Sequence, residues 1–425
     1  MEYKKLKYNY FSVNLGENVF VFNSFSGEPF LVPTEDYEMF ERGEGVFDGI
    51  EYSDIPKKSV LQTTSQYINN YFGPTGLDLS VSESCNLGCP MCFHGIALSN
   101  AEERRRLRAM PVEKAKRWID YYISYAKEKK LSTYTFHIGS AEPFVFKNNL
   151  WEIIDYICKE SKGHNLDIFL NTNLTLVDEN DIEKIKRYGV HVFVGIDGLK
   201  DANDVTRVYK GTRRGTFDDI MLRVRRLISE GVDVGVNITL NNKNFEIVEP
   251  QETVQFFYET GVKSLLIDTD IVTHISYDAR TIVDKLMEFV TFGEEKGMVI
   301  YGSWRIPFNM MTAQNSGEPK SFCAARTGKN IVVTPSKGIT FCTYSGNIIT
   351  DEQDDPKSAV ECYVNKMKEM MPKLLPGGVE ECRECALEGL CMGGCMLAHE
   401  NHGSKNYMCD IYLLATLELI KHYYS

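Results

Sequence analysis

Between Leu77 and Val272 the chain repeats a pattern of apolar strand, loop and amphipathic helix, and this repeat constrains the fold more than any other feature. The candidate strands begin near Leu77, Ser132, Leu166, Val190, Val232 and Ser264. The candidate helices run from Val112 to Lys127, Leu150 to Cys158, Glu179 to Tyr188, Phe217 to Leu227 and Glu252 to Tyr258. One unit of a full eight-unit barrel takes about 31 residues, so the segment holds about six units. The repeat predicts a partial (β/α)6 TIM-like barrel of parallel strands, with functional residues at their carboxyl ends.

Three cysteines lie within eight residues after the first predicted strand. Cys85, Cys89 and Cys92 can turn their sulfurs toward one small object, but they supply only three ligands. A structural zinc ion is closed by four protein ligands, and a ferredoxin cluster is held by four cysteines. The spacing favours an iron-sulfur cluster that keeps one iron open. A zinc loop that borrows a distant fourth ligand is the alternative.

With Phe93 directly after the last cysteine, this stretch resembles the cluster loop of the radical SAM superfamily. The resemblance implies a 4Fe-4S cluster whose open iron chelates S-adenosylmethionine, with Phe93 next to the bound cofactor.

The end of the second predicted strand resembles a further segment of that superfamily. Radical SAM enzymes usually carry Gly-Gly-Glu-Pro at this point, and here Ser140 and Ala141 precede Glu142 and Pro143. The resemblance implies that the backbone at Ser140 and Ala141 and the carboxylate of Glu142 meet the amino group of the cofactor's methionine part. Small residues still permit the close backbone approach that glycine allows.

The third and fourth predicted strands end in segments that resemble the same family. Asn173 belongs to a Thr-Asn pair, and Asp197 is followed by Arg207, the implied partner of the cofactor's carboxylate. Gly195 and Asn203 stand where the family has serine and histidine, so no ribose contact is expected from residue 195. Such residues are common in turns, so each segment alone is weak evidence for the resemblance. Their order after a cluster loop is the stronger evidence.

A second group of cysteines lies near the end of the chain. It comprises Cys323 and Cys342, then Cys382-x2-Cys385-x5-Cys391-x3-Cys395, then Cys409. This group resembles the SPASM extension of enzymes that mature peptides and proteins. The resemblance implies two auxiliary 4Fe-4S clusters, one held by Cys382, Cys385, Cys391 and Cys409, the other by Cys323, Cys342 and Cys395. A zinc ribbon is the alternative, although its two knuckles normally lie about 15 to 20 residues apart.

Two cysteines fall outside these sets. Cys158 lies on an apolar helix stripe and is expected in the core. Cys362 is either a solvent-exposed thiol or a fourth ligand of the cluster at Cys323. Without it, that cluster would have an open iron, which could bind a substrate thiolate.

The first 76 residues predict a small β-hairpin and helix unit and a linker. Apolar alternation marks strands at Tyr10 to Val13 and Val19 to Phe22, and a helix capped by Thr34 follows. The unit resembles those of peptide-modifying radical SAM enzymes, in which a leader peptide is captured by strand addition. A cap without a ligand is the alternative. The expected domains are residues 1–76, the barrel at 77–298 and the SPASM domain at 299–425.

Composition limits the partners and the compartment. A formal net charge of -12 argues against a nucleic-acid partner, which needs a basic surface. No signal-peptide run and no membrane-length apolar stretch is present, so we expect a cytoplasmic protein without a membrane partner. Twelve cysteines in a reducing compartment favour metal binding over disulfides.

Together these features predict a radical SAM/SPASM maturase of a ribosomally made precursor peptide with a leader. A flavodoxin- or ferredoxin-type reductant would reduce the cluster, and a 5′-deoxyadenosyl radical would abstract hydrogen from a peptide residue. The product radical would form a carbon-carbon or carbon-sulfur (thioether) crosslink. Asp268 and Asp270, after the sixth strand, are candidate general bases, although such aspartates also cap helices.

Three other functions stay open. Anaerobic sulfatase maturases, which oxidise cysteine or serine to formylglycine, share the SPASM arrangement. They generally have aspartate directly after the second cysteine of the extension, where this chain has Thr343 and then Tyr344. A non-catalytic iron-sulfur electron carrier would have no use for Glu142 and Arg207. A zinc-dependent interaction module would be colourless.

Overall fold

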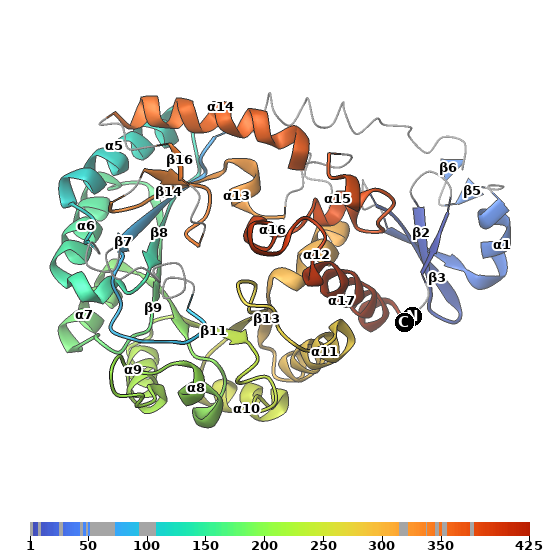
Figure 1. Ribbon diagram of the computed structural model, residues 1–425, viewed down its shortest axis with the longest axis horizontal. Coiled ribbons are helices and arrows are strands. Elements are labelled where there is room, and N and C mark those ends of the chain that lie inside the picture. Colours follow the sequence, from blue (N-terminus) through green and yellow to red (C-terminus); the bar gives the residue numbers. More distant parts are fainter. Residues whose placement is uncertain are drawn as a thin grey trace.

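A single mixed sheet of ten strands forms the body of the protein in the computed structural model (Figure 1). The structure describes residues 3–6, 10–24, 29–42, 46–47, 50–51, 73–92, 108–313, 322–336, 338–344, 348–350, 355–374 and 378–425. The strand order is β13-β12-β11-β10-β9-β8-β7-β14-β15-β16.

The six predicted barrel strands are all present and pair in parallel, in chain order. They are β7 (Gly76–Ser82), β8 (Thr133–Ser140), β9 (Asn165–Thr172), β10 (His191–Gly195), β11 (Val234–Leu240) and β12 (Ser264–Thr269). The helices around them are α5 (Val112–Glu128), α6 (Lys147–Glu160), α7 (Glu179–Tyr188), α8 (Lys200–Thr206), α9 (Phe217–Ser229), α10 (Pro250–Thr260) and α11 (Ala279–Glu295). The predicted partial barrel is therefore confirmed.

Apolar and polar side chains alternate along the strands, so that one face of the sheet packs against the helices and the other faces the inside of the barrel. On β7, Leu77, Leu79 and Val81 are buried in the main hydrophobic core together with the apolar face of α5. Because successive side chains of a strand point to opposite faces, Asp78 and Ser80 face the interior. The inside of the barrel is thus partly polar.

The helix ends follow local sequence signals. Asp178 and Asp181 form a reciprocal capping box at the start of α7, with backbone-to-carboxylate distances of 2.9 and 3.1 Å. Gly189 ends the helix in a left-handed conformation (φ = 62°), which glycine adopts without strain. These caps fix where the following strand begins.

The C-terminal third adds strands to both edges of the barrel sheet. β13 (Val299–Tyr301) pairs in parallel with β12, and β14 (Asn330–Val333) pairs in parallel with β7. Two antiparallel strands follow, β15 (Ile339–Thr340) and β16 (Ile348–Thr350). The helices of this region are α12 (Ile306–Thr312), α13 (Ala324–Thr327), α14 (Pro356–Leu374), α15 (Glu388–Cys391), α16 (Met396–His402) and α17 (Tyr407–Tyr424). In Figure 1, α15 to α17 lie between the barrel and the N-terminal unit.

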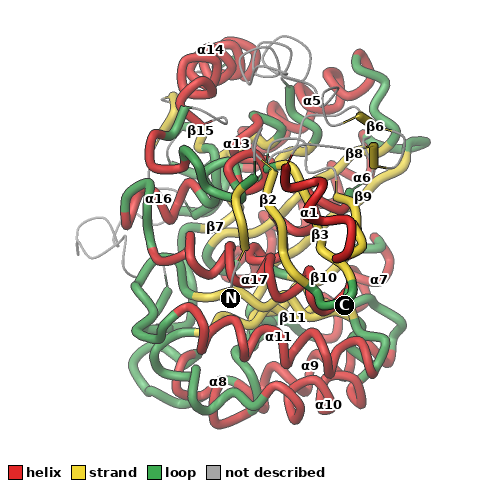
Figure 2. Tube along the Cα trace, turned by 90° about the vertical axis from the view of Figure 1, so that its right-hand side faces the viewer, coloured by secondary structure: helices red, strands yellow, loops and turns green. Residues whose placement is uncertain are grey.

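The N-terminal unit is a four-stranded antiparallel sheet with one helix, which confirms the predicted hairpin and helix. Its elements are β1 (Tyr3–Lys5), β2 (Tyr10–Asn14), β3 (Asn18–Asn23), β4 (Pro29–Pro33) and α1 (Thr34–Arg42), followed by the short pair β5 (Val46–Phe47) and β6 (Ile50–Glu51). Figure 2, which looks at this unit from its own side, shows the sheet and α1 in front of the barrel. Thr34 is the first residue of α1, and its hydroxyl donates to the Gly16 carbonyl (2.7 Å) and so fixes the preceding turn.

This unit is docked onto the C-terminal region. The Phe20 ring lies 4.7 Å from the Tyr424 ring, and the Gly389 N–H donates to the Ser24 carbonyl (2.8 Å). Lys5 pairs with Glu384 at 3.1 Å. None of the helices in the described part of the chain combines the length and apolarity that a membrane span requires.

Candidate active site

The three-cysteine loop leaves the carboxyl end of β7 and is tied to the neighbouring strand ends. The Glu142 N–H donates to the Ser84 carbonyl (3.0 Å) at the end of β8. On the other side, the Gly88 N–H donates to Val208, and Lys210 Nζ donates to the Cys85 carbonyl (2.7 Å). The loop is therefore held over the barrel mouth from two sides. Phe93 lies outside the described residues.

The thiols of this loop are partly buried and interact electrostatically with one another. Burial raises the pKa of the Cys85 thiol to about 11 and that of Cys89 to about 12, and Cys92 interacts with both. The Leu87 N–H (3.3 Å) and Asn173 Nδ2 (3.6 Å) donate to Cys85 Sγ. Hydrogen bonds to thiolate sulfurs are a feature of iron-sulfur sites, so these donors fit a cluster held by the three cysteines.

Glu142 links the ends of β8 and β9. Its carboxylate is fully buried and accepts from Phe144 N (3.1 Å), Thr172 Oγ1 (2.7 Å) and Asn173 N (2.7 Å). Burial raises its pKa to about 7 despite these donors. Because Asn173 also contacts Cys85, Glu142 and Asn173 form one network with the cluster loop.

Ser140 has a backbone conformation that favours glycine. Its φ angle is 98°, in the region that favours glycine. The Ala141 N–H donates to the Ser82 carbonyl (3.3 Å), which joins this turn to β7. A non-glycine residue in this conformation costs about 1–3 kcal/mol, so the surrounding structure enforces the turn.

Asp197 and Arg207 form a buried ion pair at the end of β10. Arg207 Nη2 lies 2.9 Å from Asp197 Oδ1, which also accepts from Thr239 N (3.0 Å). Thr206 Oγ1 donates to Asp197 Oδ2 (2.9 Å). Asp197 thus orients Arg207, whose Nε is buried without a hydrogen-bond partner among the described residues. Arg207 also interacts with Cys89 and Cys92, which places it beside the cluster loop.

The two candidate bases are in different environments. Asp268 Oδ1 accepts from the N–H and the hydroxyl of Ser303, both at 2.7 Å. No described residue donates to Asp268 Oδ2, and burial raises the pKa of this carboxyl to about 6. Asp270 accepts from Val272 N (2.9 Å), Thr273 N (3.1 Å) and the Thr273 hydroxyl. The carboxylate of Asp270 therefore caps its own turn, and only Asp268 keeps an oxygen for other partners.

Tyr344 is a site residue that the sequence did not indicate. Its N–H donates to Cys342 Sγ (3.5 Å), and its hydroxyl interacts electrostatically with Cys92, Arg207 and Asp268. Half of its surface is accessible to solvent. Its position depends on β15, which carries residues 342–344 back toward the barrel.

Some of the auxiliary cysteines interact electrostatically with one another. The Cys342 thiol interacts with Cys395 and Cys323, and burial raises its pKa to about 12. Burial likewise raises the pKa of Cys385, which interacts with Cys409. Cys362 is exposed on α14. The two predicted ligand sets stay predictions, and these electrostatic interactions are between cysteines of the same predicted set.

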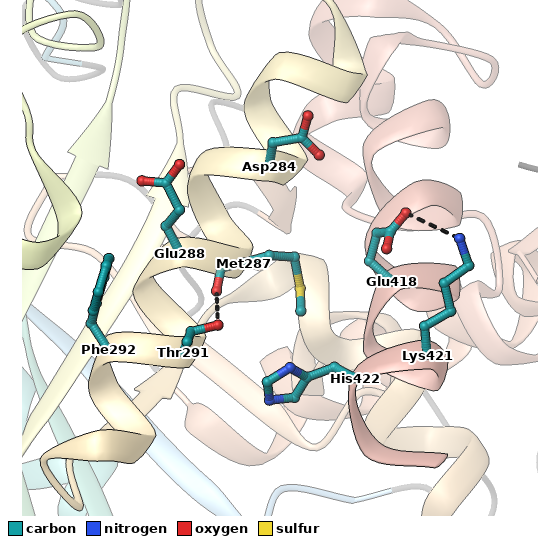
Figure 3. Close-up of a pocket in the computed structure, with 8 residues that line it drawn as sticks. All are labelled: Asp284, Met287, Glu288, Thr291, Phe292, Glu418, Lys421 and His422. Atoms are coloured by element: carbon teal, nitrogen blue, oxygen red, sulfur yellow. Dashed lines mark hydrogen bonds and ion pairs between the residues drawn. The ribbon is translucent and has the colours of Figure 1, made fainter. Parts of the chain in front are cut away.

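A surface pocket of about 540 Å³ lies between α11 and α17, away from these groups (Figure 3). It is lined by Asp284, Met287, Glu288, Thr291, Phe292, Glu418, Lys421 and His422. No cysteine and no predicted site residue lines it. We therefore place the chemistry at the barrel mouth, where buried charges and thiols gather.

Comparison with known proteins gives matches over the barrel and over most of the chain. Residues 79–257 match the model of the Radical SAM superfamily. An uncharacterised protein from Methanocaldococcus jannaschii is 27% identical over 270 residues, which cover 64% of this chain and 85% of the relative. The radical SAM cyclopropyl synthase TigE from Paramaledivibacter caminithermalis is 23% identical over 405 residues, covering 90% of this chain and 82% of TigE. The serine-type anaerobic sulfatase-maturating enzyme from Bacteroides thetaiotaomicron is 26% identical over 181 residues, 42% of each chain.

Solved structures share the fold. Native anSMEcpe with bound AdoMet and Cp18Cys peptide matches with a TM-score of 0.64 and 19% identity, covering 82% of this chain and 97% of the other. Streptococcus suis SuiB bound to precursor peptide SuiA matches with a TM-score of 0.56 and 15% identity. The match covers 92% of this chain and 95% of the SuiB chain. The sequence comparisons thus find radical SAM relatives, and the structure comparisons find proteins with the same fold.

Proposed function

We propose that this chain, as a radical SAM enzyme of the SPASM-type maturase family, crosslinks a ribosomally synthesised precursor peptide through a carbon-carbon or thioether bond. The similarity to the cyclopropyl synthase TigE over 90% of the chain carries this proposal. The fold shared with SuiB, whose structure contains a precursor peptide, supports it over a similar share of the chain.

The residues at the barrel mouth have separate tasks in this proposal. Cys85, Cys89 and Cys92 hold the cluster that binds S-adenosylmethionine, and together these groups supply the hydrogen-abstracting radical. Arg207, held by Asp197, binds the cofactor's carboxylate as a planar donor. Glu142 receives the cofactor's amino group, and its buried charge fits a cationic partner.

Asp268 is the proposed general base. Bond formation after hydrogen abstraction releases a proton and an electron from the peptide. The open Oδ2 of Asp268 can accept the proton, and an auxiliary cluster would accept the electron. Ser303 fixes the other carboxylate oxygen and so orients the base. A pKa of about 6 leaves the carboxylate mostly ionised at neutral pH.

The N-terminal sheet is the proposed site for the peptide's leader. Within the described residues, β1 pairs only with β2 and β4 only with β3, so both sheet edges can add a strand. The contact of Lys5 with Glu384 and of Phe20 with Tyr424 holds this sheet beside the auxiliary cysteines. A flavodoxin- or ferredoxin-type protein is the proposed reductant.

A sulfatase-maturase activity is the second candidate. The match to anSMEcpe has the higher TM-score of the two structures, and a sulfatase-maturating enzyme is among the relatives. That relative covers 42% of this chain, against 90% for TigE. The wider coverage favours the crosslinking reaction.

One experiment separates these reactions. The reconstituted enzyme is incubated without oxygen with reductant, S-adenosylmethionine and the precursor peptide encoded beside its gene, and the product is analysed by mass spectrometry. Loss of two hydrogens with an internal linkage in the fragment spectrum is expected. A serine or cysteine converted to an aldehyde would support the second candidate, and 5′-deoxyadenosine formation that no peptide stimulates would contradict both.

A further inference from the structure

Asp78 on β7 has one carboxylate oxygen without a partner. Asn330 Nδ2 donates to its Oδ2 (2.5 Å), from the strand β14 that pairs with β7. Oδ1 is buried and accepts no hydrogen bond from the described residues. Burying a carboxylate oxygen in this way is costly unless a cation or a donor faces it.

The carboxylate interacts electrostatically with one of the auxiliary cysteines. The Cys342 thiol interacts electrostatically with Cys323, Cys395 and Asp78. The Tyr363 hydroxyl interacts with Asp78 and Cys323 and donates to the Asn330 carbonyl (2.7 Å). Asn330, which donates to Asp78 and accepts from Tyr363, thus links this carboxylate through hydrogen bonds to a residue that interacts electrostatically with Cys323.

The register of the sheet explains this placement. Asn330 pairs with Gly76 and Val332 with Asp78, while the turn back into β15 pairs Thr340 with Val332. Cys342, two residues after Thr340, is thus carried back along β14 toward Asn330. Asp78 faces the barrel interior from the adjacent strand.

The three cysteines leave one iron of a four-iron cluster without a protein ligand. Such clusters are usually held by four residues, and iron also accepts carboxylate oxygen. Cys362, the other candidate for this position, is exposed on α14 next to Tyr363, whose own side chain is buried. The cysteine therefore points away from the site that Tyr363 lines.

We propose that Asp78 is the fourth protein ligand of the auxiliary cluster at Cys323, Cys342 and Cys395. It binds as the deprotonated carboxylate through Oδ1, and Asn330 fixes the other oxygen. The cluster is then closed, so it exchanges electrons with the reaction and does not bind a substrate thiolate. This inference uses the auxiliary cluster and holds for either reaction considered above.

The test compares full-length, anaerobically reconstituted Asp78→Cys, Asp78→Ala and Cys362→Ser enzymes with the unaltered protein. The readouts are iron content, EPR spectra of the oxidised and reduced states, and the reduction potentials of the auxiliary clusters. The EPR change on adding S-adenosylmethionine, which reports the Cys85 cluster, shows that each barrel is folded. None of these readouts needs the peptide, so failure of the proposed crosslinking leaves this test intact.

With Asp78 as a ligand, Asp78→Cys keeps the iron content and shifts the EPR signal and potential of one auxiliary cluster, because thiolate replaces carboxylate. Asp78→Ala loses iron and gives the signal of a three-iron cluster in the oxidised protein. If the Asp78→Ala variant does not fold, Asp78→Asn replaces it in this test. Cys362→Ser matches the unaltered enzyme. Unchanged spectra and potentials in the Asp78 variants, or a shift in Cys362→Ser, would overturn the proposal.

Discussion

The guanidinium of Arg207 lies against the backbone of Gly195, so that a Cβ atom at residue 195 would stand 2.4 Å from Nη1 and 2.7 Å from Cζ. A side chain at residue 195 would therefore have to shift the guanidinium of Arg207. This guanidinium also makes the ion pair with Asp197.

Replacing Gly195 with serine is expected to weaken the binding of S-adenosylmethionine, although serine is the family's usual residue there. The added atoms displace Arg207, and overpacking of this kind costs about 1–3 kcal/mol, or roughly 10- to 100-fold in affinity. Equilibrium dialysis on the reconstituted enzyme measures the dissociation constant. Gly195→Ala is the matched control, because it adds the steric clash without the hydroxyl. Tighter binding by the serine variant, and not by the alanine variant, would show that the serine hydroxyl contacts the cofactor. It would also show that the Arg207 side chain shifts at little energetic cost.

Asp268→Asn is expected to lower the crosslinking rate about 100-fold or more while 5′-deoxyadenosine still forms, because a base acts after hydrogen abstraction. Burial raises the pKa of Asp268 from 3.8 to about 6, and only the carboxylate accepts a proton. The crosslinking rate of the unaltered enzyme should therefore rise with pH through about 6 and then level off. Rapid-quench assays across this range, with both products quantified, give the two profiles. An asparagine variant with the same rate and the same profile would remove Asp268 from the mechanism.

Asp270→Asn provides the comparison within the same segment. The Asp270 carboxylate accepts three hydrogen bonds in its own turn, so its loss is expected to cost about 0.5–2 kcal/mol of stability, as for a lost cap. The thermal unfolding temperature should fall, whereas the shape of the pH profile should stay that of the unaltered enzyme. A profile that flattens in Asp270→Asn and not in Asp268→Asn would reverse the two assignments.

The barrel could be predicted from the sequence because its signals are local. Each strand and helix between Leu77 and Val272 carries its own periodicity and caps, and the cysteine spacing of residues 85 to 92 marks the site without any tertiary information. The placement of Glu142, Asn173 and Arg207 followed, since carboxyl ends of parallel strands meet at one edge.

What could not be predicted depends on pairing between distant segments. β14 is short and joins β7 from about 250 residues away in the chain, so no local pattern shows that Asp78 and Cys342 are neighbours. The different hydrogen bonding of Asp268 and Asp270 depends on Ser303, which follows β13 and donates to Asp268. The fit of Arg207 over Gly195 is likewise visible only in three dimensions.

Tyr344 supplies the last prediction, because its half-exposed side chain interacts electrostatically with Cys92, Arg207 and Asp268. A side chain there limits how a peptide residue can lie against the radical. Tyr344→Ala is expected to raise the amount of 5′-deoxyadenosine made per crosslinked peptide on the order of 10-fold, because a displaced substrate reacts less often for each radical formed.

Tyr344→Phe keeps the ring and the backbone N–H bond to Cys342, so it is the matched control and should stay near the unaltered ratio. Chromatography of the nucleoside and mass spectrometry of the peptide give both amounts, and EPR spectra of the auxiliary clusters check that the cysteine ligands are intact. Equal ratios in Tyr344→Ala and the unaltered enzyme would mean that the ring does not position the substrate, and a raised ratio in Tyr344→Phe would assign the effect to the hydroxyl.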